Sequence, residues 1–295
     1  MNKLGWKVTG VGVLFMLPGI IMILFTIVIP LVWNLVLSFM EWNGGSRMTF
    51  VKLNNYFRVF TERQGYGTIL NSLFIGIVST IVAMVLGIFL ALSVYRLTSK
   101  ESTFCRFVYF STSMMPMTVV GLLFAFVLAP DGGLVNSLLE FLHLDFLKQG
   151  WLSNPKIVNW SLAFVQGWKA SGTIMMLFYT ALIRIPPSFF EAGKLEGAGY
   201  FHELKLIIMP LMKPALALTL SMMLLWSFKS YDIVWTMTRG GPGDVSETAP
   251  LRMITIGFSF GQFGYAAAIG VVLTILVSVC IGMGRWITRG EAYEY

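Results

Sequence analysis

Residues Val8 to Phe39 read VTGVGVLFMLPGIIMILFTIVIPLVWNLVLSF, an apolar run interrupted only by Pro18 and Pro30. The run is longer than the roughly 18 residues that mark a membrane-spanning helix. It follows the basic residues Lys3 and Lys7, as a secretory signal peptide would. The apolar core of a signal peptide is only about 7–15 residues long and ends at small residues, which this run does not. We therefore expect an uncleaved first membrane helix.

Five further apolar runs follow along the 295 residues of the chain, of which 56% are hydrophobic and 12% charged. A soluble domain averages about 25% charged residues. In lipid, isolated runs of this length satisfy their backbone groups only as helices. The sequence therefore predicts an all-α protein of the lipid membrane, with one domain over residues 1–295 and six transmembrane helices. The predicted spans are residues 8–39, 68–95, 107–129, 158–183, 215–237 and 265–287.

The net charge of +7 could also indicate a nucleic-acid-binding protein. Such proteins gather basic residues on one exposed face, whereas here these residues lie mainly between the apolar runs. We expect no nucleic-acid partner. The two cysteines, Cys105 and Cys280, are too few for a disulfide framework. Both fall towards the predicted cytoplasmic side, where thiols stay reduced, and we expect them to pack as ordinary side chains.

Lys and Arg in the connections indicate the orientation of a membrane protein. With the N-terminus inside, the inner connections hold eleven of these residues and the outer ones eight. This small excess favours cytoplasmic N- and C-termini. On the outer side, Val135–Leu147 places apolar and polar residues at helical spacing, which predicts a short helix on the membrane surface. No loop is long enough for a soluble domain, and no internal repeat is visible.

The inner connection of residues 184–214 has the strongest local pattern. Pro186 and Pro187 end the preceding helix, and Ser188 with Glu191 forms an S-x-x-E capping box for a new one. Gly197 and Gly199 allow the positive φ of a sharp turn. A second helix is expected over residues 200–208, until Pro210 breaks the pattern. The first helix has the apolar residues Phe189, Phe190, Ala192 and Leu195, and exposed apolar patches usually mark a partner.

These residues resemble the EAA loop of permease subunits from binding-protein-dependent ABC importers, whose core reads E-A-A-x3-G-x9-I-x-L-P. Five positions match at the required spacing, namely Glu191, Ala192, Gly197, Ile207 and Pro210. Gly193 replaces the second alanine and Met209 the leucine, while Glu196 stands where many members have aspartate. The resemblance implies a type I ABC importer permease fold with a cytoplasmic coupling loop. Its ATPase-coupling residues would be Ser188, Phe189, Phe190, Glu191, Ala192, Gly193, Leu195, Glu196, Gly197, Ile207 and Pro210.

A second stretch extends this resemblance over nearly the whole chain. Residues 228–243 read FKSYDIVWTMTRGGPG and are followed by Ser246, Glu247 and Thr248, similar to the F-D…M-T-x-G-G-P…T-E-T stretch of maltose/oligosaccharide and glycerol-phosphate permeases. The resemblance implies import of a carbohydrate across the cytoplasmic membrane of a prokaryote. The partners would be a second permease, two ATPase subunits and an extracytoplasmic substrate-binding protein. Gly197→Asp is then expected to uncouple transport by forcing a bulky side chain into the turn.

Charged residues inside predicted spans are costly and are candidates for function. Lys169 falls in the fourth span, and Lys229 and Asp232 fall in the fifth. The last two would be i,i+3 neighbours on a helix and could form a local ion pair. A substrate or gating role is the alternative.

Polar and aromatic residues share one face of the fourth and of the fifth span. An aromatic surface beside hydroxyls suits a sugar ring, although helix packing also uses small residues. In the family that the chain resembles, the substrate lies between these spans and those of a second permease. Asn71 and Gln166 are weaker candidates, because a single amide more often bonds a neighbouring helix. The implied substrate path comprises Lys169, Ala170, Thr173, Met223, Trp226, Ser227 and Ser230.

The sequence shows no catalytic set and no metal site. His143 and His202 fall on opposite sides of the membrane without further ligands at metal spacing. No G-x4-G-K-[S/T] motif occurs, so we expect no cofactor in this chain, with ATP and Mg²⁺ bound by a partner ATPase. The glycines of residues 240–243 are interpreted as a plain turn. An ion-coupled carrier and a lipid-modifying membrane enzyme are the rival hypotheses, and a permease for glycerol phosphate or another solute remains an alternative.

Overall fold

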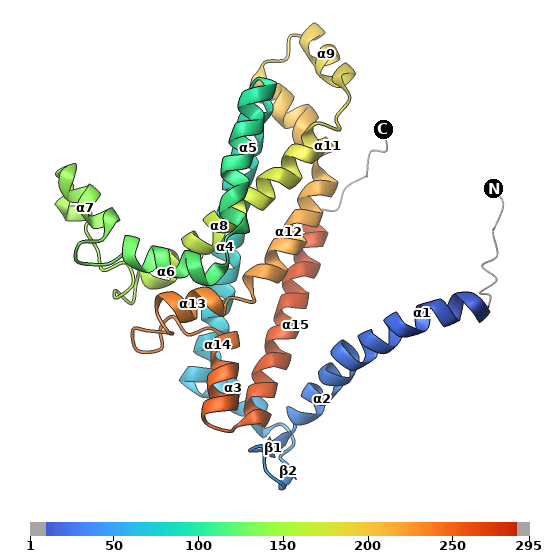
Figure 1. Ribbon diagram of the computed structural model, residues 1–295, viewed down its shortest axis with the longest axis vertical. Helices are drawn as coiled ribbons and strands as arrows, with labels where there is room; N and C mark the ends of the chain where they lie inside the picture. The colour runs from blue at the N-terminus through green and yellow to red at the C-terminus, as the bar shows by residue number, and fades with distance from the viewer. Residues whose placement is uncertain (1–9, 288–295) are drawn as a thin grey trace. The chain divides into compact units, whose positions relative to one another are not determined.

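The computed structural model describes residues 10–287, with side chains from residue 15 onward (Figure 1). Its contacts divide the chain into two compact units. The first unit contains the described residues up to 61 together with residues 253–271, and the second contains residues 62–252 and those from 272 onward. Most of the described residues are helical. Three helices are long and apolar enough to cross a membrane, and the number rises to six if each of three bent helix pairs forms one span.

The first unit begins with a helix that runs through both prolines of the first predicted span. It consists of α1 (Gly10–Ile23), a π-helical turn at Leu24–Val28 and α2 (Ile29–Leu37). Residues 8 and 9 of the predicted span lie outside the described residues. Pro30 falls directly after the π-helical turn, where a wider helix accommodates the missing N–H. Most large apolar side chains between residues 15 and 36 are exposed.

A small β-hairpin and a helix complete the beginning of this unit. β1 (Met40–Trp42) pairs antiparallel with β2 (Met48–Phe50), with Glu41 opposite Thr49. The next helix is α3 (Asn54–Thr61), and the amide of Asn55 donates to the carbonyl oxygens of Ser38 and Met40. The sequence analysis did not predict this hairpin. Its three-residue strands fall in a loop of mixed composition that has no long alternation of apolar and polar residues.

Two long helices form the centre of the second unit. α4 (Arg63–Tyr95) begins five residues before the second predicted span, and α8 (Val158–Leu182) nearly coincides with the fourth. They pack closely because Gly167 has no side chain. A Cβ atom at this position would lie 2.7 Å from the carbonyl oxygen of Ser79 and from Cβ of Val82. The sixth predicted span corresponds to α15 (Phe263–Ile287), which belongs to both units.

The third predicted span, residues 107–129, is not one straight helix. α5 (Ser99–Met114) and α6 (Met117–Val127) meet at an angle of 96°. Pro116 disfavours a helical conformation of Met115, which is extended at ψ 139°. The apolar run continues through this bend, so its length alone predicted a straight helix.

The fifth predicted span, residues 215–237, is also interrupted. α12 (Lys213–Ser227) ends ten residues before the prediction, and α13 (Asp232–Met237) follows after a break. At its other end, α12 makes an angle of 68° with the helical segment of residues 200–211. That segment consists of α10 (Tyr200–His202), a π-helical turn at Glu203–Ile208 and α11 (Met209–Leu211).

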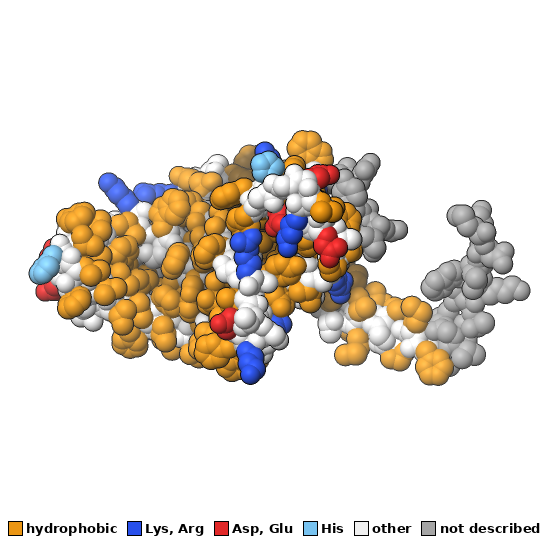
Figure 2. All heavy atoms as spheres, turned by 90° about the horizontal axis from the view of Figure 1, so that it is seen from above, with side chains coloured by type: hydrophobic (Ala, Val, Ile, Leu, Met, Phe, Trp, Pro, Cys, Tyr) orange, Lys and Arg blue, Asp and Glu red, His pale blue; other side chains and the backbone are white. Residues whose placement is uncertain are grey.

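The predicted surface helix is present in two pieces. α7 (Leu134–Phe141) is followed by a 3₁₀ turn at Asp145–Leu147. Large apolar side chains of both pieces are exposed, among them Phe141 and Phe146. The remaining helices are α9 (Pro187–Leu195) and α14 (Ala249–Ile254), the latter followed by a π-helical turn at Thr255–Ser259. Figure 2 views the molecule from above Figure 1, where hydrophobic side chains cover much of the visible face.

Candidate functional site

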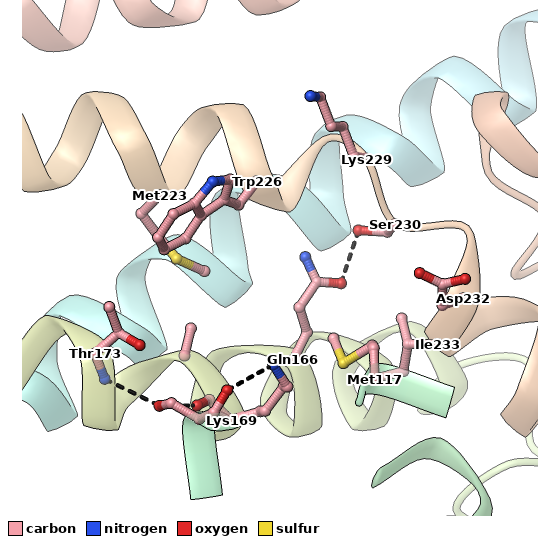
Figure 3. Close-up of a pocket in the computed structure, with 12 residues that line it drawn as sticks. Met117, Gln166, Lys169, Thr173, Met223, Trp226, Lys229, Ser230, Asp232 and Ile233 are labelled. Carbon is pink, nitrogen blue, oxygen red and sulfur yellow. Dashed lines mark hydrogen bonds between the residues drawn. The ribbon is translucent and has the colours of Figure 1, made fainter. Parts of the chain in front are cut away.

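A cavity of about 400 Å³ lies in the second unit, beside the points where its helices bend or break. One wall comes from the bend between α5 and α6, a second from the middle of α8, and a third from the break between α12 and α13 (Figure 3). Six of the seven predicted substrate-path residues line it, together with Lys229 and Asp232. The complete lining is Ser113, Met117, Gln166, Lys169, Ala170, Thr173, Met223, Trp226, Lys229, Ser230, Asp232 and Ile233.

The α5–α8 wall is tied together by Ser113. Its hydroxyl donates to the carbonyl oxygen of Lys169 at 2.7 Å and accepts from the backbone N–H of Thr173 at 2.9 Å. In return, the ammonium group of Lys169 donates to the carbonyl oxygen of Ser113 at 3.2 Å. The sequence analysis selected Lys169 and Thr173 but missed Ser113, because the predicted span was drawn through Pro116, three residues later, as one straight helix.

The α12 wall presents an aromatic ring and a thioether. Trp226 is 46% exposed, whereas Met223 is buried at the rear of the lining. Ser230 donates from its hydroxyl to the amide oxygen of Gln166 at 2.7 Å (Figure 3). The amide nitrogen of Gln166 donates to the carbonyl oxygen of Ser227 at 3.1 Å. Gln166, predicted to be a minor candidate, thus joins α8 to the end of α12.

Ser227 is the one predicted substrate-path residue that does not line the cavity. It is fully buried, and its hydroxyl accepts from Thr80 on α4 at 3.1 Å. The helical spacing placed Ser227 on the same face as Ser230, but the helix ends between them, so the spacing does not continue. Asn71 makes the hydrogen bonds between elements that were expected of a single amide. Its amide donates to the carbonyl oxygen of Glu247 and accepts from Asn159.

The predicted ion pair between Lys229 and Asp232 is wrong. The two residues do not share a helix, because α12 ends at Ser227 and α13 begins at Asp232. Among the salt bridges of the described residues, none joins these side chains. Both side chains are exposed and line the cavity from the break. In Figure 3 they lie on either side of Ser230.

The turn around residues 240–243 is more than the plain turn that was expected. Gly240 and Gly243 have positive φ, and the Gly241–Pro242 peptide bond is cis. Directly after them, Ser246, Glu247 and Thr248 are almost completely buried. The hydroxyl of Thr248 donates to the carbonyl oxygen of Ser230 at 2.9 Å, which connects this loop to the cavity wall.

Glu247 forms a salt bridge with Arg252 at 3.4 Å. Burial raises the pKa of the Glu247 carboxyl, while the charge of Arg252 opposes that shift. The carboxyl is therefore protonated at a higher pH than an exposed glutamate.

The coupling helix predicted near residue 188 is α9, which makes an angle of 73° with α8. The predicted capping box at Ser188 and Glu191 is wrong. The N-cap is Pro186, Pro187 occupies the first turn, and no side chain caps the helix. Ser188 is therefore already inside the helix. The sequence pattern could not distinguish a serine at the cap from one that follows a proline at the first helical position.

The turn after α9 was predicted in part. Gly197 has φ +77°, and the N–H groups of Gly197 and Ala198 donate to the carbonyl oxygens of Lys194 and Gly193. These two bonds define a Schellman motif. Gly199 has an ordinary φ of −76° and serves as the N-cap of α10, so its predicted positive φ is wrong.

The two halves of the loop pack against each other at Gly193, where a Cβ atom would lie 2.9 Å from Cδ1 of Ile207. Phe190 is half-buried rather than exposed, with its ring 6.3 Å from that of Tyr95. Arg96 stacks over Tyr200 at 3.7 Å. The exposed apolar side chains of the loop include Phe189, Leu195, Phe201 and Leu206, of which Leu195 is 90% exposed. Ala192, Glu191 and Glu196 are also exposed.

Pro210 does not end the second helix of the loop. The preceding π-helical turn at Glu203–Ile208 accommodates the missing N–H, and the helix continues through α11. The direction changes at Met212 instead, just before Pro214. Across the described residues there is no cluster of three or more His, Cys, Asp or Glu side chains that could hold a metal ion.

Comparison with protein families gives one match over most of the chain. Residues 83–290 match the family described as "Binding-protein-dependent transport system inner membrane component". The chain belongs to this family. The permease is thus a membrane transporter subunit rather than an enzyme, and the rival hypotheses of an ion-coupled carrier and a lipid-modifying enzyme are not supported.

Relatives match the permease over nearly its whole length. The probable ABC transporter permease protein YurN of Bacillus subtilis is 32% identical over 265 residues, covering 89% of this chain and 90% of YurN. The trehalose/maltose transport system permease protein MalF of Thermococcus litoralis is 24% identical, and the match covers 94% of this chain and 92% of MalF. A bacterial alginate ABC transporter, solved in complex with an alginate pentasaccharide-bound periplasmic protein, contains a chain with TM-score 0.82 and 18% identity that covers 98% of each chain. This likeness confirms the type I importer permease fold.

Proposed function

We propose that this permease imports a carbohydrate, such as an oligosaccharide, across the cytoplasmic membrane by alternating access. The MalF relative is named for the transport of trehalose and maltose, and the structural neighbour is an alginate transporter, so both are associated with sugars. The permease would supply half of the path and a second permease the other half. Two ATPase subunits would bind ATP and Mg²⁺, and an extracytoplasmic binding protein would deliver the substrate. The N- and C-termini would be cytoplasmic.

The cavity carries the carbohydrate proposal. Trp226 offers an apolar surface for the face of a sugar ring, while Thr173, Gln166 and Lys169 offer polar groups for its hydroxyls. Such a combination of one aromatic platform and a few polar groups is typical of a small-molecule site. Lys169 and Lys229 could also meet an anion, which keeps glycerol phosphate or another charged solute as the alternative substrate.

The loop of residues 184–214 is proposed to couple the permease to an ATPase subunit. Leu195 and Phe201 expose an apolar surface that would dock in a groove of the ATPase. The Schellman motif at Gly197 and the contact between Gly193 and Ile207 fix the two short helices relative to each other. A rigid loop of this kind would transmit the closure of the ATPases to α8 and α12.

The transport cycle would then have two states. Docking of the loaded binding protein and closure of the ATPases around ATP would open the cavity outward to receive the sugar. Hydrolysis would release the ATPases and open the cavity inward.

The first experiment is purification of the permease from its native membrane in mild detergent, followed by identification of bound proteins by mass spectrometry. A second permease and an ATPase are expected. The purified complex is then placed in liposomes with its binding protein, and uptake of labelled oligosaccharides is measured with and without ATP. Recovery of the permease alone under crosslinking, or uptake driven by an ion gradient without ATP, would overturn the proposal.

A further inference from the structure

The hydroxyl of Ser113 lies between two backbone groups of α8 that an uninterrupted helix would pair with each other. It donates to the carbonyl oxygen of Lys169 and accepts from the N–H of Thr173, which are four residues apart. A side chain inserted into the i→i−4 ladder is a recognised cause of helix bending. Ser113 therefore competes with one backbone hydrogen bond in the middle of α8.

The insertion depends on a close approach of α5 to α8. Gly172 makes that approach possible, because a Cβ atom there would collide with the carbonyl oxygen of Tyr109 and lie 2.7 Å from the Ser113 hydroxyl. Lys169 fixes the contact from the other side by donating to the carbonyl oxygen of Ser113. That carbonyl belongs to the last turn of α5, where a cation also interacts favourably with the helix dipole. This hydrogen bond gives the Lys169 ammonium a partner inside the predicted membrane span.

Beyond this crossing, α5 stays attached to the second half of α8. Arg106 stacks over the ring of Tyr179 at 4.6 Å, and the hydroxyl of Ser102 donates to that of Tyr179 at 3.3 Å. Three residues after Tyr179, α8 ends and leads through a short connection to α9. A displacement of α9 would therefore carry α5 and the second half of α8 together.

The first half of α8 has different hydrogen-bond partners, although α4 packs along both halves. Gln166 is bonded to Ser227 and Ser230 at the end of α12, and Ser230 is bonded in turn to Thr248. The segment of α8 that is bonded to Ser113, Lys169–Thr173, lies between Gln166 and Tyr179. The two sets of partners therefore meet at this segment. The bend of α5 at Met115 and the break after Ser227 border the same cavity.

We propose that Ser113 is a positioning residue that makes residues 169–173 a hinge in α8, so that movement of the coupling loop bends α8 at the cavity. This inference rests on the proposed transport function. Without the Ser113 hydroxyl, the carbonyl oxygen of Lys169 and the N–H of Thr173 pair only with each other, and α8, which is continuous over Val158–Leu182, becomes harder to bend at this point. The loop would then still move with the ATPases, but the cavity would respond less.

The first test measures uptake by the reconstituted complex carrying Ser113→Ala. This variant removes both hydrogen bonds of the Ser113 hydroxyl to α8, and we expect uptake to be lowered at least about tenfold. Ser113→Cys, which keeps the size of the side chain but is a weaker donor, should give an intermediate rate and guards against misfolding of the alanine variant. Ser111→Ala is the matched control, because the hydroxyl of Ser111 bonds only within α5, to the carbonyl oxygen of Val108.

The second test measures bending directly. Spin labels replace Phe164 and Thr180, which are exposed on the two halves of α8 about 24 Å apart along its axis, after Cys105→Ser and Cys280→Ala. Electron–electron double resonance compares the distance between the labels without nucleotide and in an ATP-trapped complex. The distance should change in the parent and in Ser111→Ala, but much less in Ser113→Ala.

The outcomes separate the two proposals. Equal uptake and equal distance changes in Ser113→Ala and the parent would overturn the hinge while leaving the transport function intact. A parent complex that shows no ATP-dependent sugar uptake would instead overturn the proposed function.

Discussion

The coupling loop and the cavity of this permease are built from hydrogen bonds of very different range. In the loop, the turn at Gly197 closes with bonds from Gly197 and Ala198 back to residues of the preceding turn. At the cavity, the bond from Ser113 to Lys169 spans 56 positions, and that from Ser230 to Gln166 spans 64. The loop is thus shaped by its own sequence, whereas the cavity exists only when α5, α8 and α12 are packed together.

This difference predicts different failures. A change in the turn of the coupling loop should leave the helices packed and alter only how movement of the loop reaches them. Strain that is confined to the turn removes few of the contacts between helices. A change at a helix crossing should disturb the packing itself, because close-packed interiors tolerate extra atoms poorly.

The largest effect is expected for Gly172→Ala, at the crossing of α5 and α8. The added methyl group would collide with the carbonyl oxygen of Tyr109, a backbone atom that cannot move aside easily. Overpacking of this kind costs about 1–3 kcal/mol. We expect a lower melting temperature of the detergent-purified permease, measured by fluorescence-detected size-exclusion chromatography after heating. Gly282→Ala in α15 is the control, because a Cβ atom there has no neighbour within 4 Å. Equal melting of the two variants would show that the crossing is looser than described.

The next largest effect is expected for Gly197→Val in the coupling loop. A Cβ atom at Gly197 meets open space, so the crowding expected from the sequence for Gly197→Asp is wrong. The strain comes from φ +77°, which costs a side-chain-bearing residue about 1–2 kcal/mol and a β-branched one more. Uptake should fall strongly while the permease still co-purifies with its partners.

Gly197→Asn is the control for this prediction, because asparagine tolerates the left-handed conformation. It should retain more uptake than Gly197→Val, with Gly197→Asp between them. Loss of co-purification in Gly197→Val would mean that the loop is needed for assembly and not only for transmission.

The sequence predicted those features of the fold that depend on residues close together in the chain. Apolar run length placed α4, α8 and α15 to within a few residues, and the glycine pattern predicted the turn at Gly197. Spacing along α8 also grouped Lys169 and Thr173, which line the cavity together with Ala170, a residue that the family resemblance implied. A helical period is reliable over any stretch in which the helix is unbroken.

The interruptions could not be predicted in the same way. The bend at Pro116 and the end of α12 at Ser227 lie inside apolar runs, where length alone favours a continuous helix. Because the sequence analysis extended the helical period beyond Ser227, it assigned this buried residue to the cavity and paired Lys229 with Asp232. Ser113 was missed for the same reason, since its role depends on a partner 56 positions away.

A moderate effect is expected for Trp226→Ala on the cavity wall. Loss of an aromatic platform of about 0.5–1.5 kcal/mol predicts a severalfold decrease in sugar uptake. Trp235→Ala is the matched control, because Trp235 is equally exposed but stacks on Tyr231 and does not line the cavity. Both variants are measured in liposomes at saturating binding protein. A similar decrease in both would assign Trp226 to packing or lipid contact rather than to substrate.

The smallest effect distinguishes two sequence patterns that look alike. Thr98 and Glu101 form a complete capping box at the start of α5, in which the carboxylate of Glu101 accepts from the N–H of Thr98 at 3.2 Å. Ser188 and Glu191 have the same spacing but form no box, because Pro186 is the cap of α9. Thr98→Ala should therefore lower the melting temperature slightly, while Ser188→Ala should leave it unchanged, since only the first substitution removes the side-chain partner of a backbone N–H group, that of Glu101. If Ser188→Ala were the more harmful of the two, the start of α9 would be capped in the assembled transporter in a way that the isolated permease does not show.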